Sequence, residues 1–357
     1  MSTVSEVAPP EARRPSRVKM IVSSVVGLVL MVGIFALLLP QVASYQSAFE
    51  RLQQMTPGWV IALVAAGLVN ILVYPFTVFI AIPGLSYWHS FVQRQAGFLV
   101  SNVVPGGGAF AVGTQYSVLA KYGVAPSAAA AAVAADAVWT YLLTLGFPAL
   151  AVLMLVIEGR ATPTYITVAV VGAIIVAVSV LAIVTILRSD AGARRVGSLA
   201  TKMVNRLLKI IKRPPRDLVP SLVTFGEHAR GLVHRRWLLL TITNAAAQLT
   251  PLLVLLAALG GVGAWPGQIT LVEAFATYTI ALLLTSFPIT PGGLGTVDAA
   301  LIGLLVAFGA DRADAVVVDL LWRLVWFLPQ LLVGAVAMGV YLLSKRREQH
   351  RLGGIVA

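Results

Sequence analysis

Two clusters of proline and glycine interrupt apolar stretches, in "VVPGGGAFAVG" (103–113) and in "PITPGGLGTVD" (288–298). At membrane depth a broken helix is tolerated only where protein surrounds the break or where it lines a wet cavity. Glycine lets a ligand approach the backbone closely, and the helix beyond points its free N–H groups at that cavity. Helix N-termini bind phosphate in this way, so the sequence predicts a site for a phosphate-bearing group. Its predicted residues are Pro105, Gly106, Gly107, Gly108, Pro291, Gly292, Gly293 and Gly295.

Five ionisable residues fall within or beside apolar segments: Asp136, Glu273, Asp298, Asp319 and Arg323. Each costs roughly 2.5 to 3.5 kcal/mol at the centre of a membrane helix, so they are rare without a role. Asp319 and Arg323 are four residues apart and can pair on one helix face. We expect Arg323 to face the cavity and to share its charge between nearby carboxylates and an anionic substrate. For Asp136 and Glu273, a hydrogen-bonded acid of purely structural use is an equal alternative.

An internal repeat relates the two clusters. Pro105-Gly106-Gly107 corresponds to Pro291-Gly292-Gly293, and a second glycine follows eighteen residues after each of these prolines. The next helix carries Asp-x-x-Trp in both copies, followed by a proline. The matched residues are Gly123 and Gly309, Asp136 and Asp319, Trp139 and Trp322, and Pro148 and Pro329. Paired, interrupted segments mark the binding site in repeat-built transporters. For one cluster, close helix packing is the simpler interpretation, whereas two in matching positions favour a site. The pattern leaves open whether the repeats are parallel or inverted.

The elements that position these residues are membrane helices. The chain has 357 residues, of which 59% are hydrophobic and 11% charged, and this composition excludes a soluble globular protein. We predict an all-α, polytopic membrane helix bundle with seven clear spans, at 20–40, 57–81, 126–157, 163–187, 237–259, 269–287 and 315–343. Two weaker segments, 97–120 and 294–309, are predicted as short spans, re-entrant hairpins or half-helices, which leaves seven to nine crossings.

The net charge of +12 follows the positive-inside pattern and does not indicate nucleic acid. Basic residues at 13–19, 188–236 and 345–351 predict that these segments are cytoplasmic, in a multi-pass protein of the cell membrane. The predicted organisation is a tail (1–19), a first membrane half (20–187), a basic loop (188–236), a second half (237–343) and a tail (344–357). The chain has no cysteine and its four histidines are scattered, so we expect neither a metal nor a cofactor.

The basic loop contains an amphipathic helix. Between Arg188 and Arg216 there are nine Lys or Arg residues against one acid, Asp190, and apolar residues recur at helical spacing. Such a helix lies flat on a membrane surface, with its cations near anionic headgroups. The predicted lipid-surface residues are Lys202, Arg206, Lys209 and Arg213. The simpler alternative is that these charges only fix topology.

The stretches "PITPGGLGTVDAALIGLLVAFG" and "LLWRLVWFLPQLLVG" resemble the flippase-like transmembrane domain of lysyl-phosphatidylglycerol synthases. The resemblance implies that Asp298 stands at the family's glutamate and Arg323 at its arginine. The first motif departs from the family pattern, because Gly107 replaces an arginine and neither Phe110 nor Gly113 supplies a charge. The aminoacyl-transferase domain of full-length synthases is not expected here, so lysine transfer is not expected as the chain's own activity.

The function predicted from these features is translocation of a phosphate-bearing lipid between leaflets. Suitable lipids are a phospholipid, an aminoacylated phospholipid or a polyprenyl-linked intermediate. No GxxxxGK[ST] phosphate loop is present, so the chain is not expected to hydrolyse ATP. The alternatives are an integral-membrane transferase, a secondary transporter of a small solute, and a non-catalytic partner of a separate lipid-modifying enzyme. The oligomeric state is not set by the sequence.

Overall fold

The computed structural model describes residues 50, 53–104, 107–160, 163–210, 214–286 and 291–353. Regular structure in these ranges is helical throughout, which confirms the predicted fold class. Several predictions lie outside the described residues: the tail 1–19, the first span 20–40, Pro105, Gly106 and Arg213.

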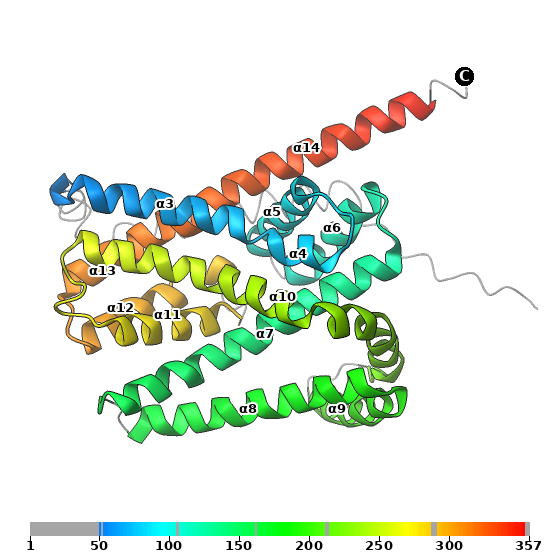
Figure 1. Ribbon diagram of the computed structural model, residues 1–357, viewed down its shortest axis with the longest axis horizontal. Coiled ribbons are helices and arrows are strands. Elements are labelled where there is room, and N and C mark those ends of the chain that lie inside the picture. Colours follow the sequence, from blue (N-terminus) through cyan, green and yellow to red (C-terminus); the bar gives the residue numbers. More distant parts are fainter. Residues whose placement is uncertain are drawn as a thin grey trace, which may run out of the picture.

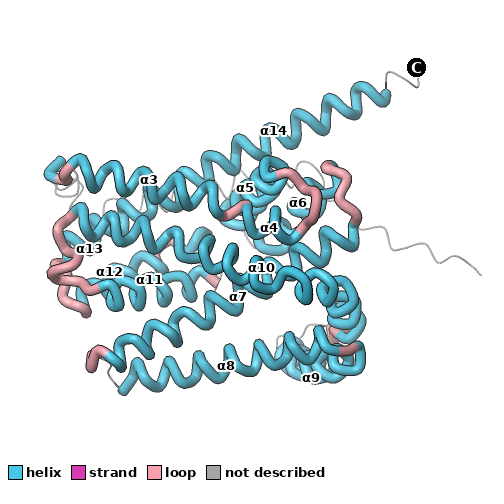
Figure 2. Tube along the Cα trace, viewed as in Figure 1, coloured by secondary structure: helices cyan, strands magenta, loops and turns pink. Residues whose placement is uncertain are grey.

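The long helices run side by side through the molecule (Figures 1 and 2). The first half contains α3 (Pro57–Val73), α4 (Phe76–Ala81), α5 (Tyr87–Val103), α6 (Gly107–Lys121), α7 (Pro126–Ile157) and α8 (Pro163–Arg188). It is followed by α9 (Asp190–Ile210) and α10 (Val219–Gly261). The second half continues with α11 (Leu271–Thr285), η2 (Pro291–Gly293), α12 (Thr296–Ala307), α13 (Arg312–Trp322), the π-helical turn η3 (Arg323–Phe327) and α14 (Leu328–Gly353). We call the end of the bundle where α9 lies the basic end.

Four stretches of the described chain are long and apolar enough to cross a membrane: Pro57–Ala81, Pro126–Ile157, Val233–Gly261 and Arg312–Lys345. They correspond to four of the predicted spans, and the predicted span 163–187 coincides with α8. The predicted span 269–287 is wrong as a full crossing. Its helix, α11, has 15 residues and is therefore about 22 Å long, short of the roughly 30 Å hydrocarbon core.

Helix α10 starts at Val219 and runs for 43 residues through the predicted boundary at 237, so the last part of the basic segment 188–236 is helical and continuous with the next span. Two of its basic residues bond to the ends of neighbouring helices. Arg230 donates from Nε to the Leu187 carbonyl at 2.9 Å, and Arg236 donates from Nη1 to the Ile80 carbonyl at 2.8 Å. Cations near the C-termini of α8 and α4 also complement the negative ends of those helices. These charged residues therefore lie inside a continuous helix and do not mark its start.

Each half contains a hairpin of two short helices joined at a proline–glycine break: α5 with α6, and α11 with α12. The first hairpin opens at the basic end, because Lys121, the last residue of α6, bonds to Ser344 late in α14. The second hairpin opens at the opposite end. There Glu273 in the first turn of α11 pairs with Arg160, just beyond the end of α7. The two hairpins thus enter the bundle from opposite directions, which makes the repeat inverted.

The predicted second glycines occupy equivalent turns in both copies. Gly123 (φ 75°) and Gly309 (φ 111°) each end the outgoing arm of a hairpin in the left-handed conformation that glycine adopts without strain. In both turns the next N–H donates back to a fully buried leucine carbonyl, Val124 to Leu119 at 3.1 Å and Ala310 to Leu305 at 2.9 Å. The internal repeat therefore extends to backbone hydrogen bonding.

Candidate functional site

Arg323 closes the second break. Its Nε lies 2.6 Å from Oδ1 of Asp298, and its Nη1 and Nη2 donate to the carbonyl oxygens of Gly292 and Gly293 at 3.0 and 3.3 Å. The Arg323 side chain is only 4% exposed. We expected this guanidinium to face a cavity and to share its charge with nearby carboxylates; the Asp298 contact agrees with the second part, while burial of the side chain argues against an open cavity beside it. In a low-dielectric interior its donors are taken by three acceptors of the protein itself.

The glycines of this break are required by its shape. Gly292, Gly293 and Gly295 have φ of 62°, 68° and 84°, which L side chains rarely adopt. A Cβ atom on Gly292 would also stand 2.6 Å from Cζ of Phe327. The break is thus a tight turn packed beneath an aromatic ring.

The Asp298 carboxylate accepts two hydrogen bonds at the start of α12. Its Oδ2 accepts from the Gly295 N–H at 2.6 Å, while its Oδ1 holds Arg323. A carboxylate already complements the positive end of this helix. An incoming phosphate at α12 would therefore have to compete with Asp298.

The pairing of Asp319 with Arg323, which their spacing allows, does not occur. Arg323 lies in the π-helical turn that follows α13, and its guanidinium is engaged by Asp298 on α12. Asp319 is buried, and its Oδ1 has no hydrogen-bond partner within the described part of the chain. The partner of Arg323 is therefore set by tertiary contact with α12 and not by spacing along one helix.

A second buried ion pair lies in the first half, between Arg94 of α5 and Asp136 of α7. Nη1 of Arg94 is 2.7 Å from Oδ2 of Asp136, and the side chains are 17% and 11% exposed. The Arg94 guanidinium also lies 4.5 Å above the Tyr74 ring. The Tyr74 hydroxyl donates to Gln248 at 3.0 Å, which links the pair to α10.

Sequence reasoning missed Arg94, because it precedes the apolar window at 97–120. A usable signal was present: the triplet Gln93-Arg94-Gln95 stands only ten residues before Pro105 and leads directly into the break. Gln93 and Gln95 are 1% and 0% exposed, and the Oε1 atom of each lacks a hydrogen-bond partner among the described residues. Buried polar groups without a partner are rare in proteins, which makes this triplet a candidate for a functional role.

The described side of the first break, Gly107, is tightly packed as well. A Cβ there would collide with the carbonyl oxygens of Val100 and Ser101, so glycine allows α6 to start against the end of α5. By contrast, a Cβ on Gly108 would meet no atom within 4 Å. Gly107 therefore has a steric role that Gly108 does not share.

The two breaks lie at a similar depth. The α5 and α14 helices run antiparallel, with Phe98 against Phe327 at 6.0 Å between ring centroids and Gly334 against the Gln95 carbonyl. Helix α5 ends at Val103, five residues beyond Phe98 and next to the first break, and Arg323 lies four residues before Phe327. The turn η2 of the second break packs against α5. The predicted site elements are therefore brought together, with ion pairs on both sides.

Glu273 and the lipid-surface residues lie elsewhere. Glu273 forms a capping box with Thr270 and pairs with Arg160, so its contacts support the structural alternative. Lys202, Arg206 and Lys209 are exposed on α9. In the described residues no group of three or more His, Asp or Glu side chains is placed to hold a metal ion.

Fold and site together define a polytopic helical membrane protein built around two inverted, broken hairpins. The family model for the lysylphosphatidylglycerol synthase TM region matches residues 23–334, and the chain belongs to this family. No curated protein matches the sequence. Membership implies a membrane protein related to lipid modification or translocation. The family comprises the membrane part that is often paired with a catalytic domain.

Proposed function

We propose that this protein moves a phosphate-bearing lipid between the two leaflets of the cell membrane. The observation that carries the proposal is the meeting of two oppositely inserted hairpins at one depth, beside the ion pairs Arg94–Asp136 and Arg323–Asp298. Repeat-built transporters place their substrates where discontinuous helices of the two repeats meet. Family membership supports a lipid as the substrate.

A lipid headgroup needs hydrogen-bond or ion-pair partners while it crosses the hydrocarbon core, because an unpaired polar or charged group there is costly. Atoms suited to this task lie on α5, α7, α13, η3 and α14. Buried atoms without a hydrogen-bond partner among the described residues include Oε1 of Gln93, Gln95 and Gln330, Oδ1 of Asp136 and Asp319, and Nε1 of Trp326. They offer acceptors and one donor to hydroxyl, amine and phosphate groups. This distribution supports passage through the protein interior.

Arg94 is the cation that a phosphate would contact first in this scheme. Its side chain is 17% exposed, against 4% for Arg323, and it has one carboxylate partner. Arg323 is committed to Asp298 and to two carbonyl groups. A phosphate can replace the Asp136 carboxylate at Arg94 with equivalent charge-assisted hydrogen bonds. We therefore assign substrate contact to Arg94 and hairpin closure to Arg323.

The test is reconstitution into vesicles with fluorescent phospholipids and a quencher that reaches only the outer leaflet. We expect the wild-type protein to expose inner-leaflet lipid to the quencher without added enzyme. The pair of substitutions Arg94→Gln and Asp136→Asn should abolish this, since it removes the phosphate contact but leaves no unpaired charge. Arg230→Gln is the matched control, because Arg230–Asp190 is an Arg–Asp pair at the surface, with side chains 40% and 49% exposed.

Two outcomes would contradict the proposal. One is wild-type vesicles in which the inner leaflet stays protected from the quencher for every phosphate-bearing lipid tested. The other is equal translocation by the wild-type protein and the Arg94/Asp136 double variant. Formation of a modified lipid in the same vesicles would instead support the transferase alternative.

A further inference from the structure

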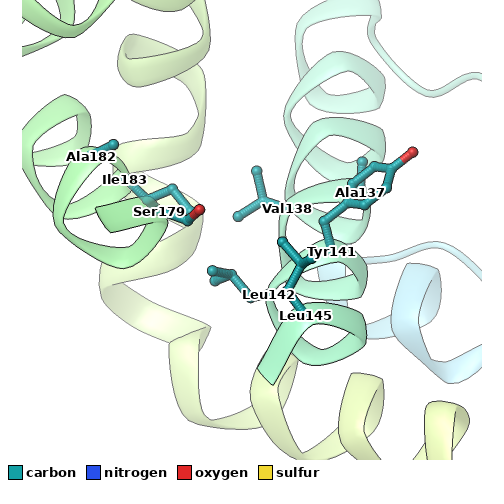
Figure 3. Close-up of a pocket in the computed structure, with 8 residues that line it drawn as sticks. All are labelled: Ala137, Val138, Tyr141, Leu142, Leu145, Ser179, Ala182 and Ile183. Carbon is teal, nitrogen blue, oxygen red and sulfur yellow. The ribbon is translucent and has the colours of Figure 1, made fainter. Parts of the chain in front are cut away.

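A groove separate from both hairpins lies between α7 and α8. It has a volume of about 340 Å³, roughly twice the 150 Å³ of an engineered apolar cavity that binds benzene. Its lining residues are Ala137, Val138, Tyr141, Leu142, Leu145, Ser179, Ala182 and Ile183. Figure 3 shows Val138 and Leu142 pointing from α7 toward α8, with the Tyr141 ring projecting away from α8.

The groove is lined mainly by hydrocarbon side chains. Six of the eight lining residues carry only aliphatic side chains. Those on α7 stand 11 to 19 positions after Pro126, inside a stretch of 32 residues that is long and apolar enough to span a membrane. Apolar walls at that depth favour an acyl chain over any polar ligand.

Helix α8 forms the outer wall of the groove. Its contacts are with α7, α9 and α10, and its outer side exposes Ile174, Val178 and Leu181 at 57%, 61% and 66%. We expect these exposed apolar residues to face surrounding lipid. Helix α8 thus has one fully exposed face and a second face that lines an open groove against α7, which allows labelling of the two faces to be compared on the same element.

The basic end of the groove leads to cationic residues. Arg188, the last residue of α8, is five positions beyond Ile183, or about 7.5 Å along the helix axis. The exposed cations Arg195, Lys202 and Arg206 follow on one face of α9. An anionic headgroup near Arg188 would therefore meet further positive charge on α9.

Three apolar side chains of α9, those of Leu199, Met203 and Ile210, are not used for packing. The helix contacts its neighbours through small residues, with Ala193 buried and Gly197 lying against Val219. Leu199, Met203 and Ile210 remain 61%, 70% and 74% exposed. An exposed apolar stripe beside a cationic one is the pattern of a helix embedded at the boundary between headgroups and acyl chains.

We infer that the α7–α8 groove binds one acyl chain of an anionic phospholipid whose headgroup lies at Arg188 and the cationic face of α9. This inference rests on the proposed function, because it makes the groove the place where the lipid is held at the basic end. It also makes a claim about binding that is independent of translocation.

The direct test uses the full-length protein in vesicles that contain phosphatidylglycerol with a photoreactive group on one acyl chain. Mass spectrometry of the illuminated protein locates the adducts. We expect adducts on Leu142 and Ile183 in severalfold excess over those on Val178 and Leu181, which face bulk lipid. Equal labelling of the two sets would overturn the inference.

A matched pair of variants adds a second readout. Ala182→Trp fills the groove, whereas Leu181→Trp adds the same ring on the neighbouring outward position. We expect Ala182→Trp to remove the groove adducts and to slow translocation severalfold, with Leu181→Trp close to wild type. Ser179→Leu is a milder filling variant, so a failure of Ala182→Trp to fold leaves the prediction testable. Unchanged groove adducts in a folded filling variant would overturn the inference.

The headgroup assignment is tested with photoreactive phosphatidylcholine and with Arg188→Gln. Near the membrane surface one cation contributes about 1 kcal/mol toward anionic lipid, so we expect Arg188→Gln to lower groove labelling by phosphatidylglycerol about fivefold. Equal labelling by both lipids would overturn the anionic assignment. Groove-selective labelling in vesicles without translocation would uphold this inference and contradict the proposed function, so the two failures are distinguishable.

Discussion

The two halves of this protein use the same ion pair with its charges exchanged. In the first half the hairpin supplies the arginine, Arg94, and the following helix the aspartate, Asp136. In the second half the hairpin supplies the aspartate, Asp298, and the following segment the arginine, Arg323. Both pairs join a hairpin to the next long helix, but only Arg323 also holds the backbone of the break. The two copies of the inverted repeat thus differ: one hairpin is held closed by its arginine, and the other has a more exposed arginine.

The largest expected effect is that of Arg323→Gln. It leaves Asp298 without its cation and frees two carbonyl groups, and breaking a buried pair by removing one partner costs about 3 to 5 kcal/mol. We expect a severe loss of thermal stability in detergent or nanodiscs. Arg230→Gln removes an exposed Arg–Asp pair and one hydrogen bond to the Leu187 carbonyl, so we expect a smaller loss of about 1 to 2 kcal/mol. Equal melting temperatures for the two variants would contradict a closing role for Arg323.

Arg94→Gln comes next and separates stability from transport. The single substitution leaves Asp136 unpaired and should be destabilising, because a buried charge loses its partner. Adding Asp136→Asn should recover much of that stability while translocation stays absent. Both are measured on the same preparations, by thermal unfolding and by the vesicle assay. Translocation that recovers together with stability would mean that Arg94 is structural, as Arg323 is.

A smaller effect compares glycines in the two breaks. Gly292→Ala must adopt a positive φ and place a methyl group against Phe327, so we expect a loss of about 1 to 3 kcal/mol in stability. Gly108→Ala has open space and lies in helix α6, where alanine is favoured by up to about 1 kcal/mol. We therefore expect Gly108→Ala to be neutral or stabilising in thermal unfolding. The reverse order would contradict the described geometry of the second break.

The smallest expected effect concerns α9. Replacing Lys202, Arg206 and Lys209 by glutamine should weaken the preference for anionic vesicles by about 1 kcal/mol per cation, without changing topology. The measurement is translocation as a function of the anionic lipid fraction. A response identical to that of the wild type would support the interpretation that these charges only fix orientation.

The sequence predicted the features that depend on local residue types, namely the helix breaks and the glycine turns. Proline and glycine marked both breaks, and the matched glycines Gly123 and Gly309 occupy equivalent turns. The partners of the buried charges were not predictable, because Arg94 meets Asp136 across 42 positions and Arg323 meets Asp298 across 25. Helix spacing pointed instead to Asp319 as the partner of Arg323.

Two differences between the predicted and observed element boundaries have physical causes. The charge at Arg230 and Arg236 placed the start of the second half at 237, whereas the helix that contains them starts at Val219 and both residues bond to the ends of neighbouring helices. The apolar stretch 269–287 indicated a full span, since hydropathy does not distinguish a crossing helix from the arm of a hairpin surrounded by protein. Both differences arise because contacts with other parts of the protein replace contacts with water or lipid.

The central claim, that the two hairpins enter from opposite faces, is tested most directly by labelling single cysteines with a membrane-impermeant thiol reagent. The chain has no cysteine, so each introduced thiol is unique. Ser127→Cys lies at the mouth of the first hairpin and Gln268→Cys at the mouth of the second, and both positions are exposed. The account predicts labelling from opposite sides of the membrane. Labelling of both from the same side would contradict it.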